Sequence, residues 1–509
     1  MSNSLRRRLT LCTLLLLCGT AMGQEKYSFV RYDLNRLHYD SNAVSMQVFL
    51  QRWSQMVSTG QGTVSIVHIG GSHVQAGTFP HRVRTNLLQA YPTLVGGRGL
   101  VFPYSAAAKC NNPNDYRVHC KERVILTRSV HKSPDYRLGL SGMAVTAQDV
   151  PTRIQMLSAE PRFDFATSRI EVLGYSGDGV VPRLSYDDRE VMPSYVDEES
   201  HRYVFNLRHT VDSFELYLPC GHGQSFTLTG VVLGNRNAGI TYHSLGVNGA
   251  ALPDVLRCPD LTSDLRLVRP DLVIFGIGIN DAHGKNFDTV AFKNNYLRLC
   301  DSIRSVNPQC AFIFITNNDS YFRTGRRRYS VNHNGLLARE TAYRLAAITG
   351  GAVWDQFEVM GGLKSMEKWQ KAGLAQRDKV HFTRAGYTLL GDLLFEAIDR
   401  ELRSDHRPVA APRCDNVNTL TPTRAKNDTS AKQSKSPARA KDTAKTKDTT
   451  PVRTTVKDST PAEKPLPRGL RRKSRTKPAT NDQRPATNDQ RSTTNIPANS
   501  RDRFPYISY

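Results

Sequence analysis

The chain of 509 residues is 39 % hydrophobic and carries a formal net charge of +23 at pH 7. This length is more than one hydrophobic core normally supports, so we expect at least two folded units. An excess of basic residues is typical of nucleic-acid-binding proteins, but over half of this excess lies after residue 410, where 22 Lys/Arg stand against 9 Asp/Glu. We therefore do not expect a nucleic-acid-binding domain.

Residues 1–23 have the features of an export signal. Three basic residues, Arg6 to Arg8, precede an apolar stretch at residues 9–17, and small residues follow before Gln24. The stretch is shorter than the roughly 20 residues that a bilayer-spanning helix needs, and no later segment is apolar enough to span one. We predict a protein without an integral membrane segment that is exported to the periplasm or cell envelope of a Gram-negative bacterium.

Short apolar runs alternate with helix-like stretches through much of the chain. Residues 79–90, 289–306 and 387–402 are predicted to be helices, the last two from the helical spacing of their apolar residues. The alternation predicts the α/β class, with a doubly wound, flavodoxin-like parallel sheet whose ligands bind beyond the carboxyl ends of the strands. The predicted strands are residues 64–69, 240–245, 272–277, 311–316 and 352–354.

The interval between residues 70 and 240 is far longer than a crossover between parallel strands needs. Within it, apolar and polar residues alternate as in half-buried strands, at residues 168–173, 203–207, 213–218 and 225–233. We predict an all-β sandwich at residues 125–235, inserted between two parts of one α/β domain. Those two parts are residues 24–124 and residues 236–404.

Residues 405–509 form a tail that is rich in Thr, Pro and Lys and poor in apolar side chains. Such a composition cannot bury enough surface to offset the entropy lost on ordering, so we predict that the tail is disordered. Its basic residues would suit contact with an anionic cell envelope. A solvated spacer is an equally good interpretation.

Seven cysteines follow the export signal. The spacings of Cys110 and Cys120, and of Cys300 and Cys310, permit local disulfides in an oxidising compartment, although an odd total argues against a complete framework. No spacing matches a zinc site, so we expect neither a bound metal nor another cofactor.

Polar residues that could act chemically follow two of the predicted strands. Ser72 comes after Gly70 and Gly71 at the end of the first strand, where a sharp turn can present its hydroxyl at the sheet edge. Asn280 follows the third strand, and its side-chain amide could donate a hydrogen bond to a developing oxyanion. Each motif alone also fits an ordinary turn or helix cap.

Asp378 and His381 precede the last predicted helix, with two residues between them. A serine nucleophile needs a general base, and that base needs an acceptor on its far nitrogen. A loop of this length allows a carboxylate and an imidazole to meet. A surface ion pair is the alternative for this motif taken alone.

The order of these motifs resembles that of the SGNH (GDSL-like) hydrolase superfamily, over about residues 60–110 and 240–402. The motifs are Gly-x-Ser at the first strand, Gly246-Val247-Asn248-Gly249 after the second, Gly-x-Asn-Asp after the third and Asp-x-x-His before the last helix. Each motif is short, but their order and positions together are specific.

The resemblance implies a role for each matching residue. Ser72 would be the nucleophile, His381 its general base and Asp378 the residue that orients His381. The backbone amides of Ser72 and Gly246, together with the side chain of Asn280, would form the oxyanion hole.

Gly71 departs from the family pattern, which usually has Asp in that position. The departure puts the support of the nucleophile turn in doubt. It also keeps open an alternative of another class, a non-catalytic glycan-binding scaffold with a degenerate site. We interpret the neighbouring His73 as a structural or substrate-contacting residue.

Residues 239–250 and 360–369 are similar to segments of bacterial peptidoglycan O-acetylesterases and related O-acetyltransferases. Those enzymes also carry a β-sandwich resembling a family 35 carbohydrate-binding module, in the place of the predicted insertion. The resemblance implies a serine esterase that removes O-acetyl groups from a cell-envelope glycan, with acetylated peptidoglycan as the first choice. An O-acetyltransferase and an esterase of another acetylated polysaccharide remain alternatives.

Overall fold

The computed structural model describes residues 27–41, 43–107, 110, 113, 115–131, 137–159 and 167–404. The predicted export signal and the predicted disordered tail lie outside these residues. Among the residues that are described, no helix is both long enough and apolar enough to cross a membrane.

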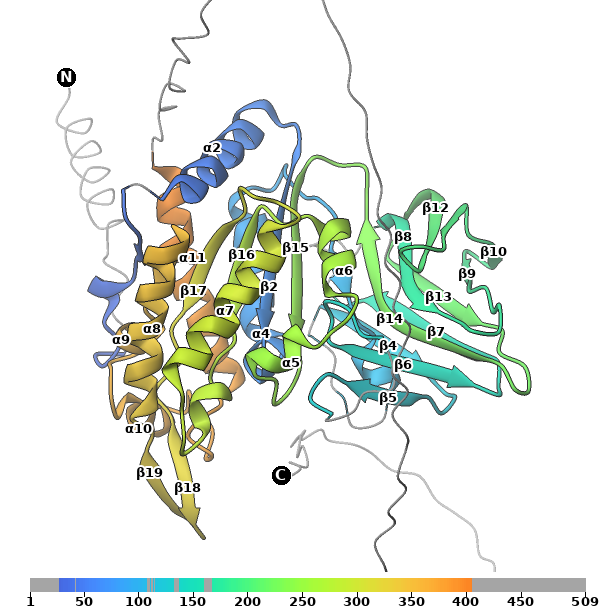
Figure 1. Cartoon of the computed structure of the whole chain (residues 1–509). Helices are drawn as coiled ribbons and strands as arrows, with labels where there is room; N and C mark the ends of the chain where they lie inside the picture. The colour runs from blue at the N-terminus through green and yellow to red at the C-terminus, as the bar shows by residue number, and fades with distance from the viewer. Residues whose placement is uncertain are drawn as a thin grey trace, which may run out of the picture. The chain divides into compact units, whose positions relative to one another are not determined.

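A six-stranded sheet lies at the centre of the α/β part (Figure 1). Its order is β1-β20-β17-β16-β2-β15, and every neighbouring pair is parallel except β1 with β20. Without the short β1, this is the strand order of a flavodoxin-like sheet, which confirms the predicted fold class. The strands are β1 Leu37–His38, β2 Thr63–Gly70, β15 Gly239–Gly246, β16 Leu272–Gly276, β17 Ala311–Ile315 and β20 Ala352–Trp354.

Helices cover both faces of this sheet. Successive residues of a strand point to opposite sides, so an apolar strand has an apolar surface on each face that a helix can bury. In β2, Val64 and Ile66 belong to the core formed with α2, α4 and α11. Val67 and Ile69 belong to the opposite core, formed with α6, α7 and α8. The helices are α2 Val44–Thr59, α3 Ser72–Gln75, α4 Thr78–Ala90, α5 Leu252–Leu256, α6 Leu261–Val268, α7 Thr289–Arg304, α8 Asn334–Thr349, α9 Gln356–Val359, α10 Ser365–Lys371 and α11 Arg384–Arg403.

Two antiparallel sheets are formed by the chain between β2 and β15. One has five strands in the order β10-β9-β13-β7-β4, and the other has the order β11-β12-β8-β14-β6-β5, with β3 also paired to β14. Their facing side chains share one core, for example Ile154 and Leu216 of the first sheet with Val172 and Phe226 of the second. This is the packing of a β-sandwich.

The four strands predicted in this interval correspond to β8, β12, β13 and β14. Strand β4 joins the five-stranded sheet although it precedes residue 125, where we placed the start of the insertion. The strands are β3 Gly99–Val101, β4 Tyr116–Cys120, β5 Ile125–Arg128, β6 Met143–Gln148, β7 Thr152–Ser158, β8 Thr167–Tyr175, β9 Arg183–Tyr186, β10 Arg189–Val191, β11 Tyr195–Asp197, β12 Arg202–Val211, β13 Ser213–Leu218 and β14 Ser225–Gly234.

Arg98 connects the sandwich to the central sheet. Its Nη1 donates to the backbone oxygen of Tyr242 at 3.0 Å and its Nη2 to Ser244 Oγ at 3.3 Å, both on β15. Its Nε pairs with Asp115, which immediately precedes β4. Both charged side chains are buried, so this ion pair fixes one end of the sandwich against β15.

The six described cysteines are all unpaired. The local disulfides that the spacings of Cys110 and Cys120, and of Cys300 and Cys310, would permit are therefore not formed. Cys300, on α7, and Cys310, just before β17, are instead buried in the same hydrophobic core.

Asp264 of α6 is a buried carboxylate that holds the loop before β6. Its Oδ2 accepts the backbone N–H of Leu140 at 2.7 Å. Gly139 permits this approach, because a Cβ there would lie only 1.8 Å from Asp264 Oδ2. Burial raises the pKa of Asp264 to about 7, with a small further rise from Asp260 and opposition from the Leu140 amide.

The titration of Asp264 predicts a stability effect that depends on pH. The pKa of an unfolded Asp is near 3.8, so the folded protein binds the carboxyl proton of Asp264 more tightly than the unfolded chain does. The resulting stabilisation is fully present below pH 4 and is lost as the pH rises to 7. Asp264→Asn removes this titration and keeps an oxygen for Leu140. Between pH 4.5 and pH 8, the unfolding free energy of the variant should therefore rise by about 3 kcal/mol relative to wild type.

Denaturant unfolding at the two pH values measures this change. Asp301→Asn, which replaces an exposed carboxylate on α7, is the matched control and should track wild type. A difference between Asp264→Asn and wild type that does not change with pH would contradict the prediction.

Candidate active site

Ser72 lies at a tight strand-to-helix turn at the carboxyl end of β2. The backbone N–H groups of Val74 and Gln75 donate to Gly71 O at 3.2 and 3.0 Å, which starts α3 directly after the strand. A Cβ at Gly70 would lie 2.2 Å from Val74 Cγ2 and 2.8 Å from the backbone oxygen of Gly276. Only glycine therefore lets β2, β16 and α3 meet this closely.

His381 contacts both of the other residues predicted to form the triad. Ser72 Oγ lies 2.8 Å from His381 Nε2, although the two residues are 309 positions apart in the chain. His381 Nδ1 lies 2.7 Å from Asp378 Oδ2. The geometry thus joins a hydroxyl, an imidazole and a carboxylate in the order that nucleophilic activation of serine requires.

The charge of Asp378 is favoured by its hydrogen bonds. Partial burial alone would raise its pKa, but the hydrogen bond and charge of His381 and the backbone amides of Val380 and His381 outweigh burial, so the pKa lies below 3.8. These amides donate to Asp378 Oδ1 at 2.9 and 3.0 Å. The ionised carboxylate accepts from Nδ1 and leaves Nε2 of His381 as the acceptor for the Ser72 hydroxyl.

The segment that carries His381 is held at both ends. Gln376 donates its backbone N–H to His381 O at 2.8 Å. Two residues after His381, the hydroxyl of Thr383 caps α11 by accepting the backbone N–H of Gly386 at 3.3 Å. The position of the imidazole is therefore fixed by the start of a 20-residue helix.

Asn280 follows β16 and lies beside the turn that precedes Ser72. Its Nδ2 donates to the backbone oxygen of Ala250 at 2.8 Å, and a Cβ at Gly71 would lie 3.3 Å from the same nitrogen. An amide nitrogen carries two N–H groups, so one remains for another acceptor. Ser72 and Asn280 flank the point at which the strand order reverses, where ligands of such sheets bind.

Gly246 ends β15 and also contacts the Ser72 turn. A Cβ there would lie 2.4 Å from Gln75 N and 2.6 Å from Gly71 O. Its backbone N–H, however, faces the Tyr104 hydroxyl at 3.4 Å, and that hydroxyl donates back to Gly246 O at 3.1 Å. The role of the Gly246 amide as an oxyanion donor stays a prediction.

His73 lies behind the triad. Its Nδ1 lies 2.8 Å from the Tyr387 hydroxyl, and its ring centroid lies 5.3 Å from that of His381. Complete burial, with a contribution from the charge of His381, lowers the pKa of His73 to about 3. His73 is therefore a neutral residue that packs against the His381 loop.

Two residues that sequence reasoning missed shape the turn beside Ser72. Gln75 Oε1 accepts the backbone N–H of Asn248 at 2.6 Å, across 173 positions of sequence. Asp281 accepts the backbone N–H of Leu252 with both oxygens at 3.2 Å, and burial raises its pKa to about 6. Gln75 carries no local signal for this contact, whereas Asp281 belongs to the Gly-x-Asn-Asp motif.

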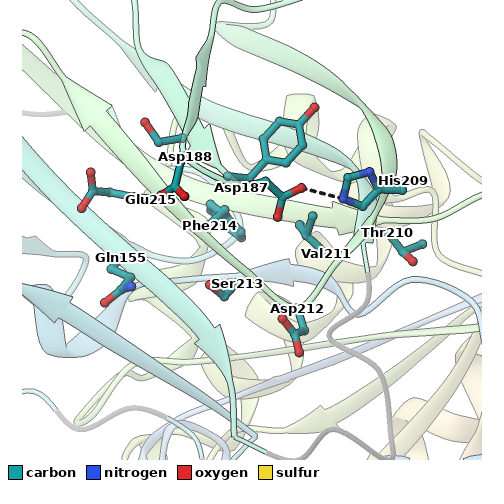
Figure 2. Close-up of a pocket in the computed structure, with 12 residues that line it drawn as sticks. Gln155, Asp187, Asp188, His209, Thr210, Val211, Asp212, Ser213, Phe214 and Glu215 are labelled. Atoms are coloured by element: carbon teal, nitrogen blue, oxygen red, sulfur yellow. Dashed lines mark ion pairs between the residues drawn. The ribbon is translucent and has the colours of Figure 1, made fainter.

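A separate cavity of about 630 Å³ lies on the sandwich and contains none of the predicted site residues (Figure 2). Asp187 and Asp188 form its β9–β10 turn with φ values of 48° and 57°, as two-residue hairpin turns require. Figure 2 shows the Asp187 carboxylate facing His209, whose Nε2 lies 2.7 Å from Asp187 Oδ2. Across the described residues, no group of three or more His, Cys, Asp or Glu side chains is arranged to hold a metal ion.

The model of the GDSL-like Lipase/Acylhydrolase family matches residues 220–389. This range includes Gly246, Asn280, Asp378 and His381. It does not include Ser72, which the strands of the two antiparallel sheets separate from the other motifs in the chain. A comparison with curated protein sequences finds no match.

Among solved structures, a peptidoglycan O-acetylesterase is similar to 72 % of this chain and 99 % of that chain, at 21 % identity and a TM-score of 0.61. An acetyl xylan esterase is 18 % identical over 31 % of this chain and 81 % of its own, with a TM-score of 0.26. A family two carbohydrate esterase from Cellvibrio japonicus is 10 % identical over 56 % of this chain and 98 % of its own, with a TM-score of 0.24.

The peptidoglycan O-acetylesterase structure shares the fold of this chain. The family match covers three of the four sequence motifs of this chain. Residues 220–389 therefore belong to a GDSL-like lipase/acylhydrolase domain of the SGNH superfamily, which makes the protein a carboxylic ester hydrolase.

Proposed function

We propose that this hydrolase removes O-acetyl groups from a cell-envelope glycan, with O-acetylated peptidoglycan as its substrate. The observation that carries the proposal is the contact of Ser72 Oγ with His381 Nε2 at 2.8 Å, at the carboxyl edge of an acylhydrolase sheet. The proposal assigns the roles of nucleophile to Ser72, base to His381 and orienting carboxylate to Asp378.

The proposed reaction passes through an acetyl-enzyme. Ser72 Oγ attacks the acetyl carbonyl carbon while His381 Nε2 takes the hydroxyl proton. The oxygen that becomes negative is stabilised by the free N–H of Asn280 and by backbone amides of the Ser72 turn. The sugar oxygen leaves with the proton from His381. Water then attacks the acetyl-serine, again with His381 as base, and acetate is released.

The choice of peptidoglycan rests on the extent of the fold likeness. The predicted α/β residues make up about half of the chain, so a match over 72 % also takes in residues of the sandwich. Residues 239–250 and 360–369 resemble the same group of enzymes in sequence. We also propose that the sandwich contacts the glycan.

We propose that the protein works outside the inner membrane. The basic and apolar pattern of residues 1–23 supports export. The 22 Lys/Arg after residue 410 would favour contact with an anionic envelope, since opposite charges attract over about 8 Å at physiological ionic strength.

Acetate release tests the proposed function. Wild type should release acetate from O-acetylated muropeptides faster than from O-acetylated xylan, and Ser72→Ala should release none above the uncatalysed rate. The serine should also react with a fluorophosphonate probe. If Ser72→Ala released acetate as fast as wild type, the proposed mechanism would be wrong. If wild type released acetate faster from O-acetylated xylan, acetylated xylan rather than peptidoglycan would be the better substrate.

Two further outcomes separate the alternatives. Transfer of acetyl groups to an added oligosaccharide, in preference to water, would make the protein an O-acetyltransferase. A chain that binds the glycan but does not react with fluorophosphonate would be a non-catalytic scaffold.

A further inference from the structure

A hairpin of two strands, β18 Tyr321–Gly325 and β19 Arg328–Val331, extends from the central domain after β17. Figure 1 shows it projecting beyond the sheet, below α10 in this view. Its eleven residues include four arginines and no acidic residue. The reaction described above uses none of them.

The base of the hairpin rests on the segment that carries Asp378 and His381. Tyr321 donates its backbone N–H to Lys379 O at 3.2 Å. The Lys379 ammonium lies 4.5 Å from the ring centroid of Tyr321 and 5.5 Å from that of Tyr329. It also pairs with Glu367 Oε1 at 2.9 Å, so the charge of this carboxylate is already neutralised.

A second contact ties the hairpin to the Asn280 side of the site. The ring of Phe322 lies 4.9 Å from that of His283, which belongs to the single turn following Asn280. Burial and the nearby charge of His381 lower the pKa of His283. The hairpin thus borders the site from Lys379, next to Asp378, to His283, three residues after Asn280.

The register places Arg328 on the face of the hairpin that touches His283. Phe322 pairs with Ser330, and Gly325 pairs with Arg328. Since side chains alternate between the faces of a strand, Arg328 shares a face with Ser330 and with its partner Phe322. Three residues at 3.3 Å each put the tip about 10 Å beyond the Phe322 contact.

Among the residues that the structure describes, the arginines of this hairpin have no counter-ion. Arg323, Arg326, Arg327 and Arg328 are exposed, and within the described ranges no carboxylate forms an ion pair with any of them. Arg327 also adopts a φ of 60°, a left-handed conformation that glycine usually takes in such turns. The turn thus keeps three consecutive cations at its tip.

We propose that Arg326, Arg327 and Arg328 form a binding site for carboxylate groups on the polymer whose ester lies at Ser72. Guanidinium groups bind carboxylates through paired hydrogen bonds, and a site about 10 Å along the hairpin suits groups carried by neighbouring units of a polymer. This inference rests on the proposed function and deepens it: the substrate is an acetylated glycan that bears carboxylates.

The test compares two forms of one substrate, O-acetylated muropeptides with free carboxylates and the same muropeptides with those carboxylates amidated. Wild type should have the lower KM for the free form, and its preference should decrease as salt rises, because exposed charges are screened. The triple variant R326Q/R327Q/R328Q should reduce that KM preference about tenfold, as expected for three exposed charge contacts.

Matched variants distinguish an effect of the positive charges from an effect on the folding of the hairpin. R326K/R327K/R328K should restore most of the preference, although lysine lacks the paired donors of arginine. Arg236→Gln replaces an exposed arginine on the loop between β14 and β15, at the opposite end of the sheet, and should leave the preference unchanged. The inference would be overturned if the triple glutamine variant kept the full KM preference for free carboxylates. It would also be overturned if its KM rose equally for the free and the amidated muropeptides.

A binding measurement distinguishes failure of the inference from failure of the proposed function. In the Ser72→Ala protein, the free muropeptide should bind about tenfold more weakly once the three arginines are replaced by glutamine. If wild type releases no acetate from muropeptides, the proposed function fails whatever the binding shows. If acetate is released but binding does not respond to the arginines, the inference alone fails.

Discussion

Replacing His381 with alanine is expected to lower kcat by about 10⁴- to 10⁶-fold, because the Ser72 hydroxyl loses its only proton acceptor within 2.8 Å in the described structure. Asp378→Asn should cost about 10⁴-fold. Asparagine can still accept the backbone amides of Val380 and His381, so the loop would keep its shape. Its N–H₂ group, however, would face Nδ1 and favour the tautomer that cannot accept from serine.

Initial rates of acetate release from a small acetate ester, with melting temperatures in parallel, measure these effects. His333→Ala, which replaces an exposed histidine at the start of α8, is the control and should keep wild-type kcat. If His381→Ala retained more than about a tenth of the activity, His381 would not be the base. His73 would be a poor substitute, because burial lowers its pKa and its Nδ1 already contacts Tyr387.

The parallel strands could be predicted because local composition specifies them. β17 is Ala-Phe-Ile-Phe-Ile, and every residue of it is buried, as in a strand covered on both faces. The β18–β19 hairpin lacks such a run, since three arginines interrupt it, and its base depends on Lys379 and His283 from other segments. Contacts of this kind leave no periodic signal in the sequence.

The motif order was sufficient to single out Ser72, Asp378 and His381, but not to predict how they meet. The register of β2 with β15 and β16 brings Gly70, Gly246 and Gly276 to one edge, whereas Asp378 and His381 come from the segment before α11. The direction of the Gly246 amide could not be predicted either, because it depends on Tyr104, 142 positions away.

The Arg98–Asp115 ion pair is unusual among the ion pairs of the described residues because both side chains are almost fully buried, with exposures of 3 % and 6 %. Burial alone would raise the pKa of Asp115, but the charge and hydrogen bond of Arg98 outweigh it and lower the pKa to about 2. Because the folded pKa lies below the unfolded value of 3.8, this group stabilises the protein above pH 4. That contribution is lost as pH falls towards 2.

Arg98→Met is therefore expected to lower the unfolding free energy by about 3–5 kcal/mol at pH 7, because it leaves the Asp115 carboxylate buried without a partner. Denaturant unfolding measures the loss. Without Arg98, burial should raise the pKa of Asp115 above 3.8, so the deficit should shrink as pH falls and the carboxyl group takes up a proton.

The double variant Arg98→Met/Asp115→Leu distinguishes loss of the pair from loss of packing. With both charges removed, stability should return to within about 1–2 kcal/mol of wild type, since apolar residues often replace a buried pair at little cost. Arg344→Met breaks an exposed pair with Glu340 and should cost less than about 1 kcal/mol. A double variant as unstable as Arg98→Met would mean that the hydrogen bonds of Arg98 to Tyr242 and Ser244, rather than its charge, hold the sandwich against β15.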